Sequence, residues 1–303
     1  MDRTFPLLSI IIPAYNSEQF IGEAIDSALA QDYPAIEVVV ANDGSTDGTH
    51  AVLASYGDRI TVIHQKNGGP ASARNNAIAH SRGEYCGLLD ADDAWHPKRA
   101  RRCIEMLEAQ RQFGIVTTDA QIIEGTVPSE RAYYNNPNLR PFPVPEAQID
   151  AIVAHNFVFI GAVFRREVID RVGGFDEAHQ LRGSEDYDLW CRCILAGERI
   201  GLIDEPLASY RVRGDSLSAN TSAQWASHVR SLAKNYDAFS RSGAHFSTVT
   251  QYAIAKHFEA EGDRRRAARA HIGVARTSPP LSTRHRVALV MKAAWLLVAS
   301  GRK

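Results

Sequence analysis

Short apolar runs alternate with amphipathic segments along the first part of the chain. Leu7–Ile12 is a continuous, largely β-branched run that stops at Pro13, as expected for a strand buried on both faces of a parallel sheet. Comparable runs recur at 36–40, 60–64 and 85–89, and segments with helical spacing of apolar residues lie between them. Strands that alternate with helices predict an α/β domain with a mostly parallel, Rossmann-like sheet flanked by helices.

A polar cluster follows each of these four predicted strands directly. The clusters are Pro13–Asn16, Asn42–Ser45, Asn67–Gly69 and Asp90–Asp93. Parallel sheets bind ligands at the carboxyl ends of their strands. We therefore expect the four clusters to converge on one ligand site at that edge of the sheet.

The last of these clusters, Asp90-Ala-Asp-Asp93, concentrates three carboxylates at the end of one strand. Like charges this close need a counter-charge to stay ionised. Oxygen ligands without neighbouring Cys or His favour Mg²⁺ or Mn²⁺, and substrate phosphates often complete the shell of such ions. The cluster thus indicates a divalent cation and a phosphorylated substrate. The alternative is an acidic loop that caps a helix starting near Pro97.

A second acidic cluster lies further along the chain. Residues 124–145 are rich in Pro, Asn and Tyr and show no period, which predicts a long surface loop of the kind that often forms a lid. The pattern then predicts a helix over 146–155, a strand over 160–165 and a glycine turn over 171–176. Ser184 is the expected N-cap of a further helix, whose first turn carries Glu185, Asp186 and Asp188.

From Ser222 onward the pattern is helical, and we place a boundary between an α/β domain over 1–219 and a helical region over 220–303. From Asp263 to the end, the sequence contains one acidic residue and ten basic residues. The segment 287–299 is apolar apart from Lys292 and too short to span a bilayer. It predicts either a helix packed on the α/β domain or one that lies in a membrane interface, with its basic neighbours meeting anionic lipid.

Composition narrows the class of protein only slightly. The 303 residues allow one large domain with a smaller appendage, and the net charge of −1 gives no electrostatic argument for nucleic acid. The four cysteines form no C-x-x-C pair, which favours free thiols in a reducing compartment. Without an evident leader or a run of about 20 apolar residues, we expect a cytoplasmic protein, or one peripheral on the cytoplasmic membrane face.

Six motifs, in their order and spacing, resemble the inverting family 2 glycosyltransferases of the GT-A fold. The motifs are Ser9–Asn16, Asn42–Gly48, Gly68–Asn75, Asp90–Asp93, Gly173–Asp176 and Glu185–Trp190. The resemblance covers about the first two thirds of the chain. It implies a GT-A fold, here with a C-terminal helical appendage. It also implies a nucleotide-sugar donor, most often a uridine diphosphate sugar, bound at the strand ends.

The resemblance also implies donor contacts. Pro13, Ala14 and Tyr15 would wall the nucleobase, and Asp43 would accept a hydrogen bond from it. Arg74 would approach the base or the phosphates, whereas on the residues alone Tyr15 could be a core tyrosine and Arg74 a surface ion pair. The complete set of expected substrate-binding residues is Pro13, Ala14, Tyr15, Asn16, Asp43, Gly69, Arg74, Asp90, Ala91, Asp92, Arg211 and Arg213.

By the same resemblance, Asp93 is the expected metal ligand, with Asp92 as a second ligand or a contact to the ribose or sugar. The ion, Mg²⁺ or Mn²⁺, would neutralise the leaving nucleoside diphosphate. Inverting transfer needs a base that takes the proton of the acceptor hydroxyl, and a positioned carboxylate meets that need. The resemblance gives this catalytic role to Asp186, with Glu185 beside it as a donor or acceptor contact. On the residues alone, both carboxylates could merely stabilise a helix N-terminus.

The predicted function is therefore transfer of a sugar from a nucleoside diphosphate sugar to a hydroxyl of a cell-surface polysaccharide or lipid-linked glycan. A nucleotidyltransferase also uses a metal at the ends of parallel strands, but it would favour a glycine-rich, basic loop after the first strand. A catalytically silent nucleotide-binding module would not need both the Asp90–Asp93 cluster and Asp186. These two alternatives stay open at the level of the sequence.

Overall fold

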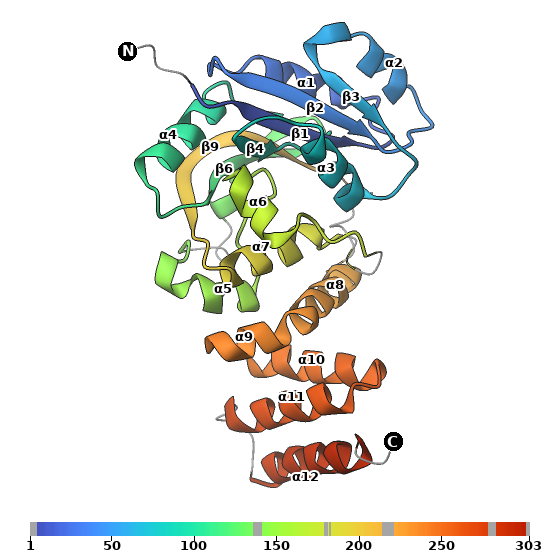
Figure 1. Ribbon diagram of the computed structural model, residues 1–303, viewed down its shortest axis with the longest axis vertical. Helices are drawn as coiled ribbons and strands as arrows, with labels where there is room; N and C mark the ends of the chain where they lie inside the picture. The colour runs from blue at the N-terminus through green and yellow to red at the C-terminus, as the bar shows by residue number, and fades with distance from the viewer. Residues whose placement is uncertain are drawn as a thin grey trace.

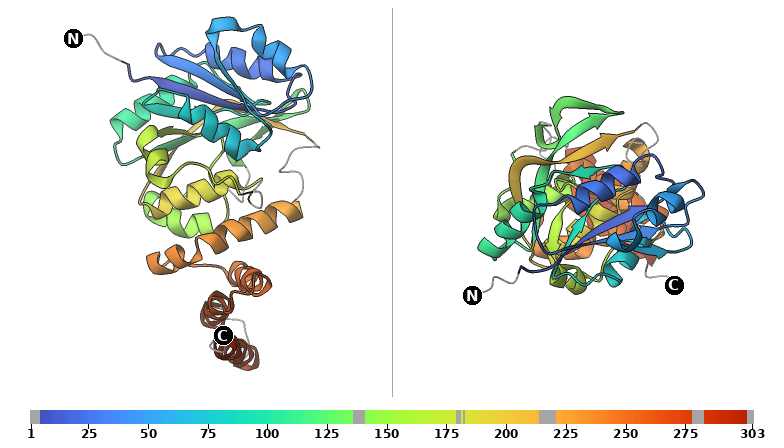
Figure 2. Two further views of the ribbon diagram at one scale, coloured as in Figure 1. Left: turned by 45° about the vertical axis from the view of Figure 1, so that its right-hand side comes forward. Right: turned by 90° about the horizontal axis from the view of Figure 1, so that it is seen from above.

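A curled sheet with helices packed against it forms the first two thirds of the chain, and a column of helices extends below it (Figure 1). The computed structural model describes residues 5–135, 141–178, 181, 183–213, 221–277 and 283–300. Seen from the side, the last helices continue the column away from the sheet (Figure 2).

The first half of the sheet is parallel, as its apolar runs predict. Strands β1 (Leu8–Ala14), β2 (Ile36–Asn42), β3 (Thr61–His64) and β4 (Tyr85–Leu88) pair in the order β3-β2-β1-β4. β1 is buried on both faces because Ile10 and Ile11 belong to the cores on opposite sides of the sheet. The helices that follow the strands in this half are α1 (Ile21–Leu29), α2 (Thr49–Ala54), α3 (Pro70–Ala79) and α4 (Arg99–Ala109), with a 3-10 turn η1 (Gly57–Arg59) before β3.

The second half of the sheet is mixed. β8 (Val163–Arg165) runs antiparallel to both β4 and β6 (Ile115–Glu124), and β6 runs parallel to β9 (Ile200–Val212). The short β5 (Ala94–Trp95) joins β9 in the antiparallel sense. The predicted α/β class is thus confirmed, but parallel pairing dominates only among the first four strands.

The stretch 124–145 contains more regular structure than its composition predicts. Gly125, with φ of 66°, turns the chain after β6, so that β7 (Val127–Ala132) folds back onto it as a hairpin. β7 pairs with β6 alone among the described strands, and an exposed edge strand tolerates this polar composition. Two 3-10 turns follow, η2 (Tyr133–Asn135) and η4 (Pro145–Ala147); residues 136–140 lie outside the described part.

Two local features of the α/β part are the entry to α1 and the continuity of β9. Ser17 does not cap α1 with its side chain; its carbonyl oxygen accepts from the backbone N–H of Phe20 and Ile21, one turn before the helix begins. The two apolar runs at 200–203 and 207–210 form one strand, β9, which keeps its pairing with β6 through register shifts. Gly173 and Gly174 have the positive φ that the glycine turn predicted over 171–176 requires.

The helical part of the chain is packed onto the α/β part. Its helices are α8 (Thr221–Lys234), α9 (Tyr236–Ser242), α10 (Thr248–Ala260), α11 (Arg264–Thr277) and α12 (Thr283–Ser300). Val229 and Leu232 of α8 share a hydrophobic core with Leu189 of α7 (Glu185–Leu195). The helices α5 (Gln148–Ala154) and α6 (Arg166–Val172) complete this layer. The proposed boundary between residues 219 and 220 itself lies outside the described residues.

No helix in the described ranges is both long and apolar enough to cross a membrane.

Candidate functional site

A large cavity opens at the carboxyl ends of the parallel strands and reaches across to α8. Its volume is about 1260 Å³, above the usual range of about 300–1,000 Å³ for ligand pockets. Residues from the clusters after β1, β2 and β4 line one side, and the start of α7 with part of α8 lines the other. The predicted convergence is observed for these three clusters. Gly69, from the fourth, lies in a small adjoining recess that Glu185 also borders.

The loop after β1 presents an exposed ring to this cavity. Tyr15 has 46% of its surface exposed, which excludes the core-tyrosine alternative. Next to it, Asn16 adopts φ of 49°, a left-handed conformation that Asn tolerates. Its side-chain oxygen accepts from the N–H of Thr46 at 2.8 Å, and its own N–H donates to the hydroxyl of Ser45 at 3.0 Å. Asn16 thus ties together the loops that follow β1 and β2.

Asp43 shapes the neighbouring glycine turn. Its carboxylate accepts from the backbone N–H of Gly68 at 2.7 Å and of Gly69 at 2.8 Å, and from the amide of Gln65 at 2.8 Å. Asp43 also lines the cavity. A hydrogen bond from this carboxylate to a nucleobase stays a prediction, while its bonds to the turn are a role that the sequence did not suggest.

The three clustered aspartates separate in space. Asp90 and Asp92 line the cavity with Ala91, whereas Asp93 is buried behind them and accepts from the N–H of Arg211 at 2.8 Å. Burial, and then the charges of Asp90 and Asp92, raise the pKa of Asp93 well above its usual value. Asp92 is therefore the better placed of the two predicted metal ligands.

The two arginines at the end of β9 also differ. The guanidinium of Arg211 donates to Glu23 Oε2 at 2.8 Å, to the carbonyl oxygen of Gly125 at 2.7 Å and to that of Asp92 at 2.9 Å. Its side chain thus braces the aspartate loop. Arg213 lies at the cavity wall with a guanidinium nitrogen 3.5 Å from Asp92 Oδ2.

The donor set on this side fits a hard cation whose remaining ligands come from substrate. No group of three or more His, Cys, Asp or Glu side chains in the described ranges is arranged to hold a metal by itself. Burial and then the charge of Asp90 raise the pKa of Asp92, so a cation beside these two carboxylates would relieve their repulsion. Mg²⁺ is usually held by one or two carboxylates together with substrate phosphates.

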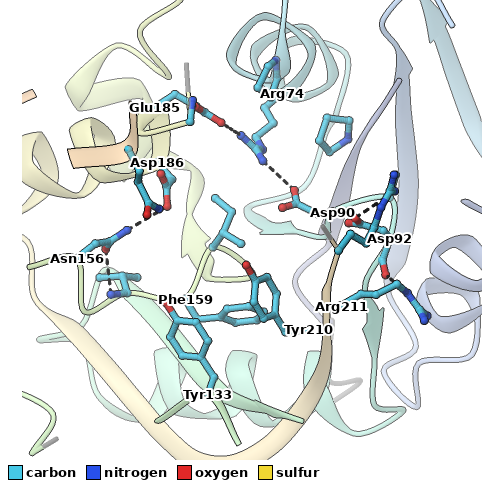
Figure 3. Close-up of a pocket in the computed structure, with 18 of the residues that line it drawn as sticks. Arg74, Asp90, Asp92, Tyr133, Asn156, Phe159, Glu185, Asp186, Tyr210 and Arg211 are labelled. Atoms are coloured by element: carbon cyan, nitrogen blue, oxygen red, sulfur yellow. Dashed lines mark hydrogen bonds and ion pairs between the residues drawn. The ribbon is translucent and has the colours of Figure 1, made fainter. Parts of the chain in front are cut away.

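Arg74 connects the two acidic clusters. It is buried, and its two terminal nitrogens lie 2.8 Å from Asp90 Oδ1 and 2.8 Å from Glu185 Oε1 (Figure 3). Burial alone would lower the pKa of Arg74, but the charges of Asp90 and Glu185 outweigh burial and raise it. The surface ion pair considered for Arg74 is therefore not what the structure shows. Glu185 is fully engaged too, since its other oxygen accepts from the N–H of Gly183 at 2.7 Å.

Asp186 points into the cavity from the first turn of α7 (Figure 3). Its Oδ2 accepts from the side-chain amide of Asn156 at 3.1 Å, and Asn156 is itself fixed by the N–H of Val158 at 3.1 Å. Burial, then the charge of Glu185, raise the pKa of Asp186 to about 7, although Arg74 opposes them. A carboxylate with a pKa near neutrality suits a general base.

The remainder of the cavity wall was not predicted from the sequence. Tyr133, Phe159 and Tyr210 form a connected ring cluster, with centroid separations of 5.2 to 5.8 Å. Asn156 and the α8 residues Trp225 and His228 complete this side. These residues belong to no motif and come from segments distant in sequence, so only the fold brings them together.

Comparison with known proteins identifies relatives of this chain. A family model described as glycosyl transferase family 2 matches residues 9–173. An uncharacterized glycosyltransferase of Rickettsia typhi is 33% identical over 240 residues, covering 76% of this chain and 73% of that protein. The succinoglycan biosynthesis protein ExoO of Rhizobium meliloti is 35% identical over 222 residues, covering 70% of this chain and 63% of ExoO.

Two solved structures share the fold. TarS of S. aureus, solved in complex with UDP-GlcNAc, superimposes with a TM-score of 0.59 at 19% identity, covering 97% of this chain and 87% of that one. The mannosyltransferase PcManGT of Pyrobaculum calidifontis, solved with GDP-Man and Mn²⁺, gives a TM-score of 0.60 at 22% identity, covering 99% and 87%. The chain therefore has the fold of these GT-A-type enzymes.

Proposed function

The chain belongs to glycosyl transferase family 2, and from that membership we propose that it transfers a hexosyl group, with inversion, from a nucleoside diphosphate sugar to a glycan hydroxyl. One observation carries the proposal: Asp90, Asp92 and Asp186 line the same cavity from opposite acidic clusters. The complex of TarS with UDP-GlcNAc supports a nucleotide-sugar donor such as a UDP-sugar, and the name of ExoO, a succinoglycan biosynthesis protein, supports a role in polysaccharide biosynthesis.

In this proposal the donor lies along the strand ends. Tyr15 packs on the nucleobase with its exposed ring, beside Pro13 and Ala14, because an aromatic face suits a flat heterocycle. Arg213 contacts the diphosphate, while Arg211 holds the aspartate loop in place. The supporting residues of the donor side are Asn16, Asp43, Gly69, Arg74, Asp90 and Ala91.

Asp92 holds the divalent cation, Mg²⁺ or Mn²⁺, with Asp93 supporting the loop from behind. When bound, the ion neutralises charge on the leaving diphosphate. Asp186 takes the proton of the acceptor hydroxyl, and Asn156 keeps its carboxylate aimed into the cavity. Glu185, with both oxygens engaged, positions the start of α7 and fixes Arg74.

Donor and metal binding test this proposal directly. We expect a member of the panel UDP-glucose, UDP-galactose, UDP-N-acetylglucosamine and GDP-mannose to stabilise the protein in the presence of Mn²⁺, by about 2.7 kcal/mol at a hundredfold Kd. Asp92→Asn should remove the Mn²⁺-dependent part of this stabilisation because it removes an oxygen ligand. Thermal unfolding followed with and without Mn²⁺ measures both effects.

Asp58→Asn is the matched control, since Asp58 is exposed in η1 and does not line the cavity. It should respond to donor and Mn²⁺ as the unmodified protein does. If none of the donors in the panel stabilised the protein, the donor proposal would be contradicted. Retention of the full Mn²⁺ effect in Asp92→Asn would contradict the metal assignment alone.

The end of the helical column presents an apolar surface. Among the described residues α12 packs chiefly on α11, with Ala293 and Leu296 buried, and it lies at the far end of the column from the sheet, so it is not the helix packed directly on the α/β domain that was one of the two expectations (Figure 1). Its outer side exposes Val287, Val290, Met291, Trp295, Leu297 and Val298. α12 contains no acidic residue, and Arg284 is exposed at its start. We propose that this surface rests on an anionic membrane, where aromatic and basic side chains are favoured.

Vesicle flotation tests the membrane proposal. The protein should float with vesicles of phosphatidylcholine and phosphatidylglycerol, and Met291→Glu with Trp295→Glu should reduce the bound fraction severalfold because charges are costly in the interface. Val249→Glu, at an equally exposed apolar position on α10, should float normally. If the Met291→Glu, Trp295→Glu protein floated as well as Val249→Glu, the membrane proposal would be contradicted.

A further inference from the structure

The side of the cavity around Asp186 is built differently from the donor side. The α8 residues Gln224, Trp225 and His228 line it together with Asn156 from the loop after α5. Trp225 has 43% of its surface exposed, although α8 is otherwise held in the hydrophobic core by Val229. Trp225 thus presents a partly exposed indole inside the cavity, next to polar side chains. Such a surface suits a ligand that has one apolar face.

The helix that carries Trp225 is packed against the helix that carries Asp186. His228, one helical turn from Trp225, packs its ring on Tyr187 with centroids 4.5 Å apart, and Tyr187 follows Asp186 directly in α7. The hydroxyl of Tyr187 donates to the carbonyl oxygen of Ile152 at 2.6 Å. The start of α7, which carries Asp186, and the part of α8 that carries His228 are therefore packed against each other.

A buried charge cluster locks the other end of α8 to α7. Asp188 is fully buried and accepts from Lys234 Nζ at 2.9 Å, from Asn235 at 3.1 Å and from Arg192 at 2.8 Å. Lys234 also reaches Asp176 at 2.5 Å, in the glycine turn before α7. These bonds make the first helix of the helical region an integral part of the cavity wall.

The chemistry of this wall distinguishes between acceptors. None of the four lining side chains Gln224, Trp225, His228 and Asn156 is a Lys or Arg, and burial lowers the pKa of His228 to about 4, so the imidazole is neutral at pH 7 and does not attract phosphate. A lipid chain would require a continuous apolar lining, which Gln224, His228 and Asn156 interrupt. A sugar ring, by contrast, has an apolar C–H face and hydroxyls around its edge.

We propose that α8 forms the acceptor subsite, and that the acceptor presents a sugar ring that stacks on Trp225 while its hydroxyls bond Gln224, His228 and Asn156. This inference rests on the proposed function, because it assumes Asp186 as the base. In the transfer, the acceptor oxygen bonds to the anomeric carbon as the bond from that carbon to the diphosphate oxygen breaks. The hydroxyl proton passes to Asp186, and the electron pair leaves with the diphosphate.

Acceptor kinetics test the proposal. The acceptor probes are p-nitrophenyl glycosides of glucose, galactose, mannose and N-acetylglucosamine, with glycerol and 1-octanol as alcohols without a sugar ring. The unmodified protein should transfer to at least one glycoside and to neither alcohol. Trp225→Ala should raise the KM for that glycoside by at least about tenfold, and Trp225→Phe should restore part of the loss because it keeps an aromatic face.

Two measurements separate this inference from the function it rests on. Donor Kd by calorimetry and the slow transfer of the sugar to water should be unchanged in Trp225→Ala, because the donor side is untouched. Tyr252→Ala is the matched control, since Tyr252 is 44% exposed on α10 and does not line the cavity.

If the unmodified protein binds no donor, the proposed function itself fails. If it transfers to glycosides but Trp225→Ala and Tyr252→Ala show equal KM values, the function stands and the α8 subsite is wrong. Transfer to glycerol or 1-octanol as readily as to a glycoside would also overturn the α8 subsite.

Discussion

Asp186→Asn is expected to abolish sugar transfer while the nucleotide-sugar donor still binds. The amide has nearly the same shape as the carboxylate, and its oxygen can still accept the hydrogen bond from Asn156. What it lacks is the basic oxygen that takes the acceptor proton. Loss of a general base costs about 10²- to 10⁴-fold in rate. Initial rates of nucleoside diphosphate release and donor Kd by calorimetry would separate the two effects.

A control variant and a pH profile give two further tests of the role of Asp186. Asp58→Asn, remote from the cavity, should retain normal rates. Because burial and Glu185 raise the pKa of Asp186 to about 7, kcat/KM of the unmodified protein should fall as the pH is lowered through that value and Asp186 becomes protonated. Asp186→Asn should lose this dependence in its residual activity. Full transfer by Asp186→Asn would show that another group is the base.

The sequence predicts the first half of the fold well because three of its four strands, β1, β2 and β4, are largely buried. A strand such as β1 must be continuously apolar, and that pattern is visible without any knowledge of its neighbours. β7 is an exposed edge strand whose composition resembles that of a loop, and β8 is only three residues long. In such segments tertiary pairing, and not local pattern, decides the structure.

The same distinction explains the site. Motif order predicts which residues gather at the strand ends, and the cavity includes nearly all of them. It does not predict which carboxylate is buried, since Asp92 and Asp93 are adjacent in sequence, and only the fold places the N–H of Arg211 at Asp93 and the guanidinium of Arg213 near Asp92. Nor does it predict Trp225, because no local pattern marks a residue on α8 as a neighbour of Asp186. That proximity depends on how α7 and α8 pack.

Arg74→Met is expected to be the most destabilising change in the cavity. Arg74 is buried between Asp90 and Glu185, with 2.8 Å contacts to both, so its removal leaves Glu185 buried without a counter-charge. Breaking a buried ion pair by removing one partner costs about 3–5 kcal/mol. Urea denaturation, giving the free energy of unfolding, measures the loss. Glu185→Gln in the same chain should recover part of it, because the orphaned charge is then removed.

Arg102→Met provides the contrast, because Arg102 pairs with Glu205 on the surface, with the two side chains 45% and 46% exposed, and such pairs contribute only about 0–1 kcal/mol. Arg74 also lowers the pKa of Asp186, so Arg74→Met should move the acid limb of kcat/KM to higher pH, an effect that a purely structural contact would not produce. Equal losses of unfolding free energy in the two variants, together with an unmoved pH limb, would show that Arg74 does not couple the two acidic clusters.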